Sequence, residues 1–301
     1  MNILLIGATG LLGLNLINKL KFDKLFLNIH KKNYPVVDKK NIYKVSLDFS
    51  DDSFRIFLRN NNIDFIYHAG GMTDVEKCEI NKKKCLEINY TLVKKIVDVL
   101  IEFPQIKLIY FSTDHLFSGS QKFYSEESKP NPLNNYALSK CLAERVIKKK
   151  LVNFLIIRTN FFGWGPTYRK SFSDFIFYNL LKNNDIFLYK NVYFTPILIE
   201  SLINIVLKLI DLKQSGIFNI ASNDRVSKFE FGVLLANYFS LDVKLINSIS
   251  YIPKTTIRPL DMSLSISKIE SLNLTTSSVK DEIKKLKNQF NRTYYKDIIN
   301  L

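Results

Sequence analysis

Short apolar runs with the length of strands alternate with amphipathic runs that have helical spacing, starting at the first residues of the chain. Strand candidates in the N-terminal half fall at 2–6, 24–29, 43–47, 64–68, 107–112 and 153–159. Helical patterns fall between them at 11–20, 51–60, 75–101 and 135–150. Crossovers between such strands build a parallel sheet that helices cover on both faces. The chain is therefore predicted to have an α/β fold with a doubly wound parallel sheet.

The pattern becomes less regular after about residue 164. Helical runs at 172–182, 197–211, 227–239 and 277–290 are mixed with short strand candidates at 186–189 and 216–220. We predict a dinucleotide-binding domain formed by residues 1–163 plus about 190–222. A smaller C-terminal α/β lobe, formed by about 164–189 plus 223–301, is predicted to bind the substrate.

A glycine turn, Gly7-Ala8-Thr9-Gly10-Leu11-Leu12-Gly13, joins the first predicted strand to the first predicted helix. The first glycine allows a sharp turn, the second lets backbone approach a pyrophosphate, and the third lets the helix pack close to the strand. The free N–H groups and the dipole of the helix N-terminus favour phosphates. This arrangement is typical of a Rossmann-type dinucleotide site, with cofactor contacts predicted at Gly7, Thr9, Gly10, Leu11, Leu12 and Gly13.

The end of the second predicted strand indicates which dinucleotide is bound. An acid at this place would bind the adenosine ribose of NAD, but the residues here are His30, Lys31 and Lys32. Two cations suit a 2′-phosphate, so NADP(H) is favoured, while a solvated lysine pair would leave NAD(H) open. Further cofactor contacts are predicted after the third and fourth strands, at Asp48, Phe49, Ala69, Gly70 and Gly71.

Tyr136 and Lys140 form a Tyr-x-x-x-Lys pair within the helical pattern of 135–150. This spacing places the phenol and the ammonium on one face of a helix. The cation is expected to lower the pKa of the phenol, which makes Tyr136 a usable proton donor and acceptor.

The position of this pair separates it from chance matches of the same spacing. Two such matches exist, Tyr90 with Lys94 and Tyr178 with Lys182. Tyr136 lies 23 residues after Thr113, a hydroxyl residue at the carboxyl end of the fifth predicted strand, and neither Tyr90 nor Tyr178 has such a partner. Ligands of open parallel sheets bind at that edge, so Thr113 is expected to hydrogen-bond the same carbonyl that Tyr136 protonates.

Together these residues resemble an extended short-chain dehydrogenase/reductase, and more narrowly the dTDP-4-dehydrorhamnose reductases and related sugar-nucleotide reductases. The resemblance rests on the glycine turn, Ser112-Thr113-Asp114, Pro130-Asn131-Pro132, Tyr136 and Lys140. It extends to Arg158-Thr159, to Gly216-Ile217-Phe218-Asn219 before Ser227, and to Arg258-Pro259 before Leu264 and Lys268. It covers nearly the whole chain.

The resemblance implies a catalytic triad of Thr113, Tyr136 and Lys140, with Tyr136 and Lys140 also contacting the cofactor. It further implies sugar contacts at Thr73, Asp74, Asp114 and Phe161, and a contact between Arg258 and the nucleotide diphosphate. Phe161 stands where the family usually carries tryptophan, and the stretch 163–170 also differs from the usual pattern. His115 follows Asp114 where dehydratases carry an acid, which disfavours dehydration. We expect His115 to be a packed loop residue and His68 to be structural.

The expected activity is NADPH-dependent reduction of a 4-keto-6-deoxy sugar nucleotide, similar to that of dTDP-4-dehydrorhamnose reductase. Such an enzyme is an NAD(P)-dependent oxidoreductase of the CH–OH class, in deoxysugar and surface polysaccharide biosynthesis. Two alternatives stay open: an epimerase or dehydratase of the same superfamily, and a non-catalytic regulatory subunit with this fold.

The formal net charge of +15 suggests a nucleic-acid partner, but the type and placement of the cations argue against one. Arginine, the usual reader of bases and phosphates, is scarce, and the lysines are scattered rather than gathered on one stripe. We therefore expect a nucleotide-sugar substrate and no nucleic acid, and the sequence leaves a homodimer open.

Several features indicate a cytoplasmic protein. No apolar run is long enough to span a membrane, and the first apolar run ends in the glycine turn rather than in a signal-peptide cleavage site. Cys78, Cys85 and Cys141 cannot all pair, so we expect free thiols in a reducing compartment. No cluster of ligand residues with metal-binding spacing is present in the sequence, so no metal is expected.

Overall fold

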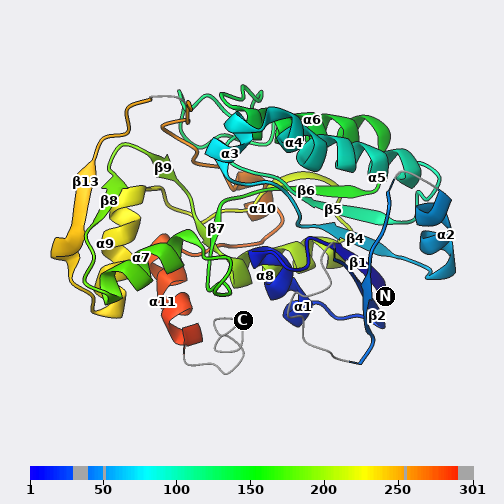
Figure 1. Ribbon diagram of the computed structural model, residues 1–301, viewed down its shortest axis with the longest axis horizontal. Coiled ribbons are helices and arrows are strands. Elements are labelled where there is room, and N and C mark those ends of the chain that lie inside the picture. The colour runs from blue at the N-terminus through cyan, green and yellow to red at the C-terminus, as the bar shows by residue number, and fades with distance from the viewer. Residues whose placement is uncertain (30–39, 50–51, 254–255, 291–301) are drawn as a thin grey trace. The chain divides into compact units, whose positions relative to one another are not determined.

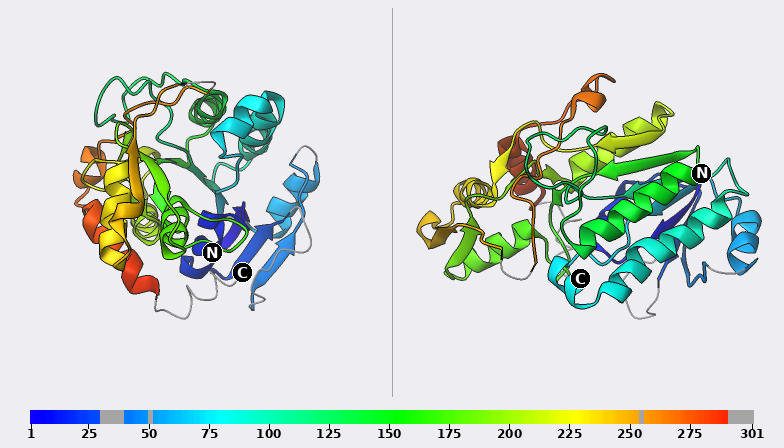
Figure 2. Two further views of the ribbon diagram at one scale, coloured as in Figure 1. Left: turned by 60° about the vertical axis from the view of Figure 1, so that its left-hand side comes forward. Right: turned by 90° about the horizontal axis from the view of Figure 1, so that it is seen from above.

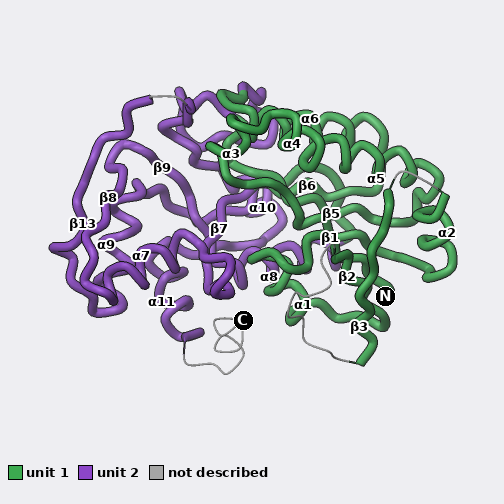
Figure 3. Tube along the Cα trace, in the orientation of Figure 1, with its two compact units in different colours: residues 1–116, 132–158, 213–218 green, residues 117–131, 159–212, 219–301 purple. Residues whose placement is uncertain are grey.

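The computed structural model describes residues 1–29, 40–49, 52–253 and 256–290 (Figures 1 and 2). Its contacts divide the chain into two compact units (Figure 3). Unit 1 consists of Met1–Leu116, Pro132–Arg158 and Lys213–Phe218, and unit 2 of Phe117–Asn131, Thr159–Leu212 and Asn219–Leu301. The sequence-based division instead assigned residues 117–131, 159–163, about 190–212 and 219–222 to the cofactor domain. Which residues serve cofactor and which serve substrate stays a prediction.

Unit 1 contains the seven-stranded sheet, whose order is β11-β6-β5-β4-β1-β2-β3. Neighbouring strands from β3 to β6 are all parallel. The strand order reverses direction between β1 and β4, which is where doubly wound sheets bind ligands. The predicted doubly wound α/β fold is therefore confirmed. The strands are β1 (Asn2–Ile6), β2 (Lys24–Asn28), β3 (Ile42–Val45), β4 (Phe65–His68), β5 (Lys107–Phe111), β6 (Phe154–Arg158) and β11 (Gly216–Asn219).

Helices lie on both faces of this sheet (Figure 1). On one side lies α1 (Leu11–Lys19), and on the other lie α4 (Lys82–Leu86), α5 (Leu92–Leu100) and α6 (Asn135–Lys150). The central strands are buried along nearly their whole length, as expected for parallel strands covered on both faces. Leu4 of β1, Ile66 of β4 and Ile156 of β6 share one core. Phe54 of α2 (Asp52–Asn60) and Ile96 of α5 belong to the same core.

The stretch 75–101, predicted as one helix, is broken into four segments. They are α3 (Val75–Ile80), α4 (Lys82–Leu86), the π-helical turn η1 (Glu87–Thr91) and α5 (Leu92–Leu100). Asn81 separates α3 from α4 because its backbone, at φ −118° and ψ 60°, is not helical. The π turn places Asn89 in a buried position, where its side chain bonds both backbone groups of Met72. The prediction of one continuous helix was therefore wrong, because the backbone leaves the helical conformation at Asn81, while residues 82–100 stay helical through the π turn.

Unit 2 has its own core around Trp164, which packs against the rings of Phe177, Phe239 and Phe290 and donates its indole N–H to the Leu286 carbonyl, 3.1 Å away. Its strands are β7 (Phe161–Phe162), β8 (Ile186–Tyr189), β9 (Tyr193–Phe194), β10 (Ile197–Leu198), β12 (Val226–Ser227) and β13 (Ile246–Ile249). Its helices are α7 (Phe172–Leu181), α8 (Ile199–Asp211), α9 (Lys228–Phe239), the 3-10 turn η2 (Val243–Leu245), α10 (Ser267–Glu270) and α11 (Val279–Phe290).

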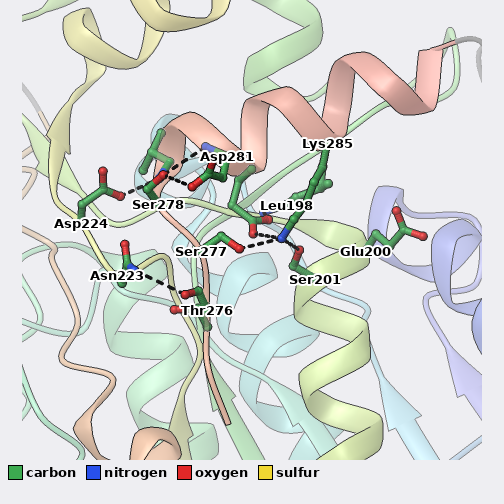
Figure 4. A network of polar contacts seen from close by, with 12 residues as sticks. Leu198, Glu200, Ser201, Asn223, Asp224, Thr276, Ser277, Ser278, Asp281 and Lys285 are labelled. Carbon is green, nitrogen blue, oxygen red and sulfur yellow. Dashed lines mark hydrogen bonds and ion pairs between the residues drawn. The ribbon is translucent and has the colours of Figure 1, made fainter.

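A polar network fixes α11 within unit 2 (Figure 4). Asp224 accepts a hydrogen bond from the Val279 N–H at 2.6 Å, which satisfies a backbone donor at the helix start. Glu282 is fully buried, accepts from the Leu198 N–H at 3.1 Å, and pairs with the Lys285 ammonium at 2.7 Å. These contacts join α11 to β10. Within the described residues, no helix is long and apolar enough to cross a membrane.

Candidate active site

The three glycines of the turn after β1 have different surroundings. Gly7 has a φ of +85°, and a Cβ there would lie 2.4 Å from the backbone nitrogen of Gly70. A Cβ at Gly13 would lie 2.2 Å from the Gly7 carbonyl oxygen. At Gly10 the nearest atom to a Cβ, the same Gly7 oxygen, is 3.3 Å away. Close backbone packing therefore requires Gly7 and Gly13, whereas Gly10 is the least restricted of the three.

Gly10 is also the N-cap of α1, and it supplies no side-chain hydrogen bond to the helix start. The first turn contains no acidic residue that would repel an anion. An uncapped helix N-terminus beside a glycine without a side chain fits a pyrophosphate. Of the other turn residues, Thr9 and Leu11 are partly buried and Leu12 is buried.

The other predicted cofactor residues are placed less uniformly. His30, Lys31 and Lys32 lie outside the described residues. Asp48 is exposed, while the ring of Phe49 is buried against Phe54 at a centroid distance of 4.9 Å. The small residues after β4, Ala69, Gly70 and Gly71, are partly buried. Their roles toward a cofactor stay predictions.

Thr113, Tyr136 and Lys140 all belong to unit 1. Thr113 follows β5, and Tyr136 lies in the first turn of α6 (Asn135–Lys150), whose bounds match the prediction. Asn134 caps this helix by accepting from the Ala137 N–H at 2.9 Å. The Thr113 side chain lies close enough to the Tyr136 phenol to lower its pKa, so the structure brings the two predicted oxygen-binding groups together.

Burial controls the protonation of this pair. It raises the pKa of Tyr136, and the nearby Thr113 side chain lowers that pKa by a smaller amount. The expectation that Lys140 lowers the Tyr136 pKa is therefore not met in this structure. The Lys140 ammonium instead donates to the Phe111 carbonyl at 2.6 Å and lies 4.2 Å from the centre of the Tyr110 ring. Burial lowers the pKa of Lys140 to about 7, because a buried ammonium loses its hydration.

Sequence reasoning missed Asn89 and Ser139, whose hydrogen bonds hold the backbone at Tyr136 and at Met72. The Asn89 amide donates to Ser139 Oγ at 3.0 Å and to the Met72 carbonyl at 2.9 Å. Ser139 Oγ donates to the Tyr136 carbonyl at 2.7 Å. The available signal was an asparagine within the helical pattern 75–101, because a polar side chain buried there must find partners.

The predicted substrate residues fall in both units. In unit 1, Thr73 and Asp74 are exposed, and Asp74 caps α3 by accepting from the Lys77 N–H at 3.0 Å. Asp114 is buried, and its carboxylate accepts from the Thr113 hydroxyl at 3.3 Å. In unit 2, Phe161 is partly buried in β7. The backbone N–H of Arg258 donates to the Tyr251 hydroxyl at 3.1 Å. Their substrate roles stay predictions.

The two histidines of this region lie in packed surroundings. The ring of His115 packs edge-on against Tyr136, at a centroid distance of 5.7 Å. His68 is buried at the end of β4, and burial, together with the charge of Lys140, lowers its pKa to about 3. Both rings therefore have packing contacts, as expected from the sequence, and His68 is neutral at pH 7.

The other tyrosine–lysine pairs have different partners. Lys94 forms an ion pair with Asp98 at 2.7 Å, and the Tyr178 ring packs against Phe177. All three cysteines are free and buried, which confirms the expectation of free thiols. In the described part of the chain, no group of three or more His, Cys, Asp or Glu side chains is placed to hold a metal ion.

The chain is similar to known proteins in sequence and in fold. The family model described as "RmlD substrate binding domain" matches residues 1–292. A curated relative, the probable low-salt glycan biosynthesis reductase Agl14 of Haloferax volcanii, is 25% identical over 293 residues, covering 94% of this chain and 96% of that protein.

Two solved structures extend the comparison. A hypothetical dTDP-4-dehydrorhamnose reductase from Sulfolobus tokodaii superposes with a TM-score of 0.77 and 31% identity, covering 92% of this chain and 96% of that one. The dTDP-4-dehydrorhamnose reductase of Bacillus anthracis, solved in complex with NADP, gives a TM-score of 0.82 at 21% identity, covering 96% of this chain and 100% of that one. The second likeness concerns the fold.

Proposed function

The chain belongs to the RmlD family of extended short-chain dehydrogenase/reductases, and from that premise we propose that it is an NADPH-dependent reductase of a 4-keto-6-deoxy sugar nucleotide. The observation that carries the proposal is the buried proximity of Thr113 and Tyr136 at the carboxyl end of β5, with Lys140 one turn further along α6. The names of the relatives support a sugar nucleotide as the substrate and a nicotinamide cofactor.

The bound cofactor supplies the hydride, and the residues of this chain manage the oxygen and its proton. Thr113 and Tyr136 hold the carbonyl oxygen of the sugar by hydrogen bonds. Tyr136 gives its phenolic proton to that oxygen as negative charge develops on it. Lys140 carries the positive charge that stabilises the phenolate left behind. The start of α1, with Gly10 as its cap, binds the pyrophosphate of the cofactor.

The test is NADPH oxidation by the purified protein with a panel of keto-sugar nucleotides. We expect stoichiometric loss of NADPH and formation of a hydroxyl only with 4-keto-6-deoxy sugars. An epimerase would change the sugar without net loss of NADPH, and a regulatory subunit would bind cofactor without turnover. Either result would contradict the proposed reductase.

A preference for NADPH over NADH is predicted from Lys31 and Lys32. Charge-assisted hydrogen bonds to a 2′-phosphate favour NADPH, and solvent screening reduces the gain to about tenfold, or about 1.4 kcal/mol. Binding titrations with both cofactors at low and high salt measure this preference. It should shrink with salt and collapse in the Lys31→Ala/Lys32→Ala double variant. Equal affinities in the wild type at low salt would show that these lysines are only solvated.

A further inference from the structure

Glu144 is a buried carboxylate one helical turn beyond Lys140, and the proposed chemistry does not use it. Only 3% of the residue is exposed, and its side chain accepts hydrogen bonds from two other elements. The Arg158 guanidinium, at the end of β6, binds it through Nη2 at 2.7 Å and Nε at 3.2 Å. The Ser112 hydroxyl donates to it at 2.6 Å. Every contact therefore fixes the carboxylate on the inner face of α6.

The carboxylate is connected both to the helix that carries Tyr136 and Lys140 and to the strand end that carries Thr113. Tyr136, Lys140 and Glu144 follow one another at intervals of four residues, so they lie along the same face of α6. Ser112 directly precedes Thr113, so the hydrogen bond from Ser112 to Glu144 ties the strand end that carries Thr113 to the same helix. Glu144 is thus the point at which β5, β6 and α6 are joined beside Lys140.

Lys140 needs such a neighbour because its own surroundings are poor in compensating charge. Its ammonium has a carbonyl partner on Phe111 and an aromatic ring beneath it. A buried ammonium without a nearby carboxylate tends to lose its proton. The titratable groups that act on it are Glu144 of α6, His68 of β4, Tyr110 of β5 and Cys85 of α4. Tyr136 shares its face of α6, and Arg158 of β6 is paired with Glu144.

We propose that Glu144 is a positioning residue for the reaction: held by Arg158 and Ser112, its carboxylate lies one helical turn beyond Lys140 and keeps the Lys140 ammonium charged. The inference rests on the proposed function, since it assigns Glu144 a role through Lys140. A purely structural ion pair between Glu144 and Arg158 would stabilise the fold and leave the titration of Lys140 unchanged. The two roles therefore differ in a measurable property.

The experiment measures the protonation of Lys140 directly. Protein with 13C at the lysine ε carbons is titrated by NMR, and the Lys140 signal is assigned by its absence from the Lys140→Met variant. We expect Glu144→Gln to lower the apparent pKa of Lys140 by about one pH unit or more, because it removes a nearby negative charge. The alkaline limb of the kcat profile for NADPH oxidation should move to lower pH by the same amount.

A second variant guards against loss of the fold. Glu144→Gln removes the carboxylate that pairs with the buried Arg158 guanidinium, which is strongly destabilising. The Glu144→Gln/Arg158→Met double variant removes both charges and avoids that cost. It should still lower the apparent pKa of Lys140, by less than the single variant, because the negative charge of Glu144 and the positive charge of Arg158 are removed together.

Glu282 of unit 2 provides the matched control, since it is also a buried helical carboxylate paired with a cation, Lys285. Glu282→Gln should change stability and leave the Lys140 titration unchanged. An unaltered Lys140 titration in the Glu144 variants would overturn the inference and leave the proposed reductase intact. Absence of turnover in the wild type would instead contradict the proposed function, while the NMR titration would still decide the role of Glu144.

Discussion

Tyr136→Phe is expected to lower kcat for NADPH-dependent reduction by about 10³-fold, because general acid catalysis by a positioned side chain contributes roughly 10²–10⁴-fold. The change removes only the phenolic hydroxyl. The ring packs with Val75, Cys78, Cys85 and the edge of His115, and phenylalanine preserves these contacts. Cofactor affinity and thermal stability should therefore stay close to the wild-type values. Steady-state kinetics and a cofactor titration on the same preparation measure both quantities.

Tyr90→Phe and Tyr178→Phe are the matched controls, since each removes a hydroxyl from a Tyr-x-x-x-Lys pair. Both variants should retain nearly wild-type activity, because Lys94 is paired with Asp98 and the Tyr178 ring packs against Phe177. A wild-type rate in Tyr136→Phe would remove this tyrosine from the mechanism. Loss of activity in a control variant instead would assign the proton donor to that pair.

Local pattern was sufficient to predict most elements of the sheet and its helices. The helix at 135–150 begins and ends as predicted, because Asn134 caps its start and three lysines occupy its last turn. The run at 197–211 was predicted as helix throughout, but Ile197 and Leu198 form β10 before α8 begins. These two residues pair with β7, and a partner strand distant in the sequence leaves no mark on local periodicity.

The candidate site shows the same division between local and tertiary information. The spacing of Tyr136 and Lys140, together with Thr113 at a strand end, could be predicted because each is a local pattern in a known topology. The contacts of Lys140 with Phe111 and Tyr110 could not be predicted, because they depend on how closely α6 packs against β5. The sign of the Tyr136 pKa shift was wrong for the same reason, since burial is a tertiary property.

The glycine turn allows binding and folding to be separated within one motif. Gly10→Val is expected to weaken NADPH binding by about 100-fold or more, because a branched side chain would occupy the space beside the helix N-terminus that a pyrophosphate needs. The fold should survive, since a Cβ at Gly10 meets its nearest neighbour, the Gly7 oxygen, at 3.3 Å, and a small shift relieves that contact. Cofactor titration and thermal unfolding of the same variant test both statements.

Gly13→Ala should show the reverse order of effects. Its Cβ would lie 2.2 Å from the Gly7 oxygen and 2.8 Å from the backbone of Ala8, so α1 must move away from β1. Overpacking of this kind costs about 1–3 kcal/mol and occasionally more, which lowers the melting temperature by several degrees. Any loss of NADPH affinity should follow from that displacement. A stable Gly10→Val variant with unchanged NADPH affinity would show that the turn serves only the fold, because Gly7 and Gly13 alone account for its close packing.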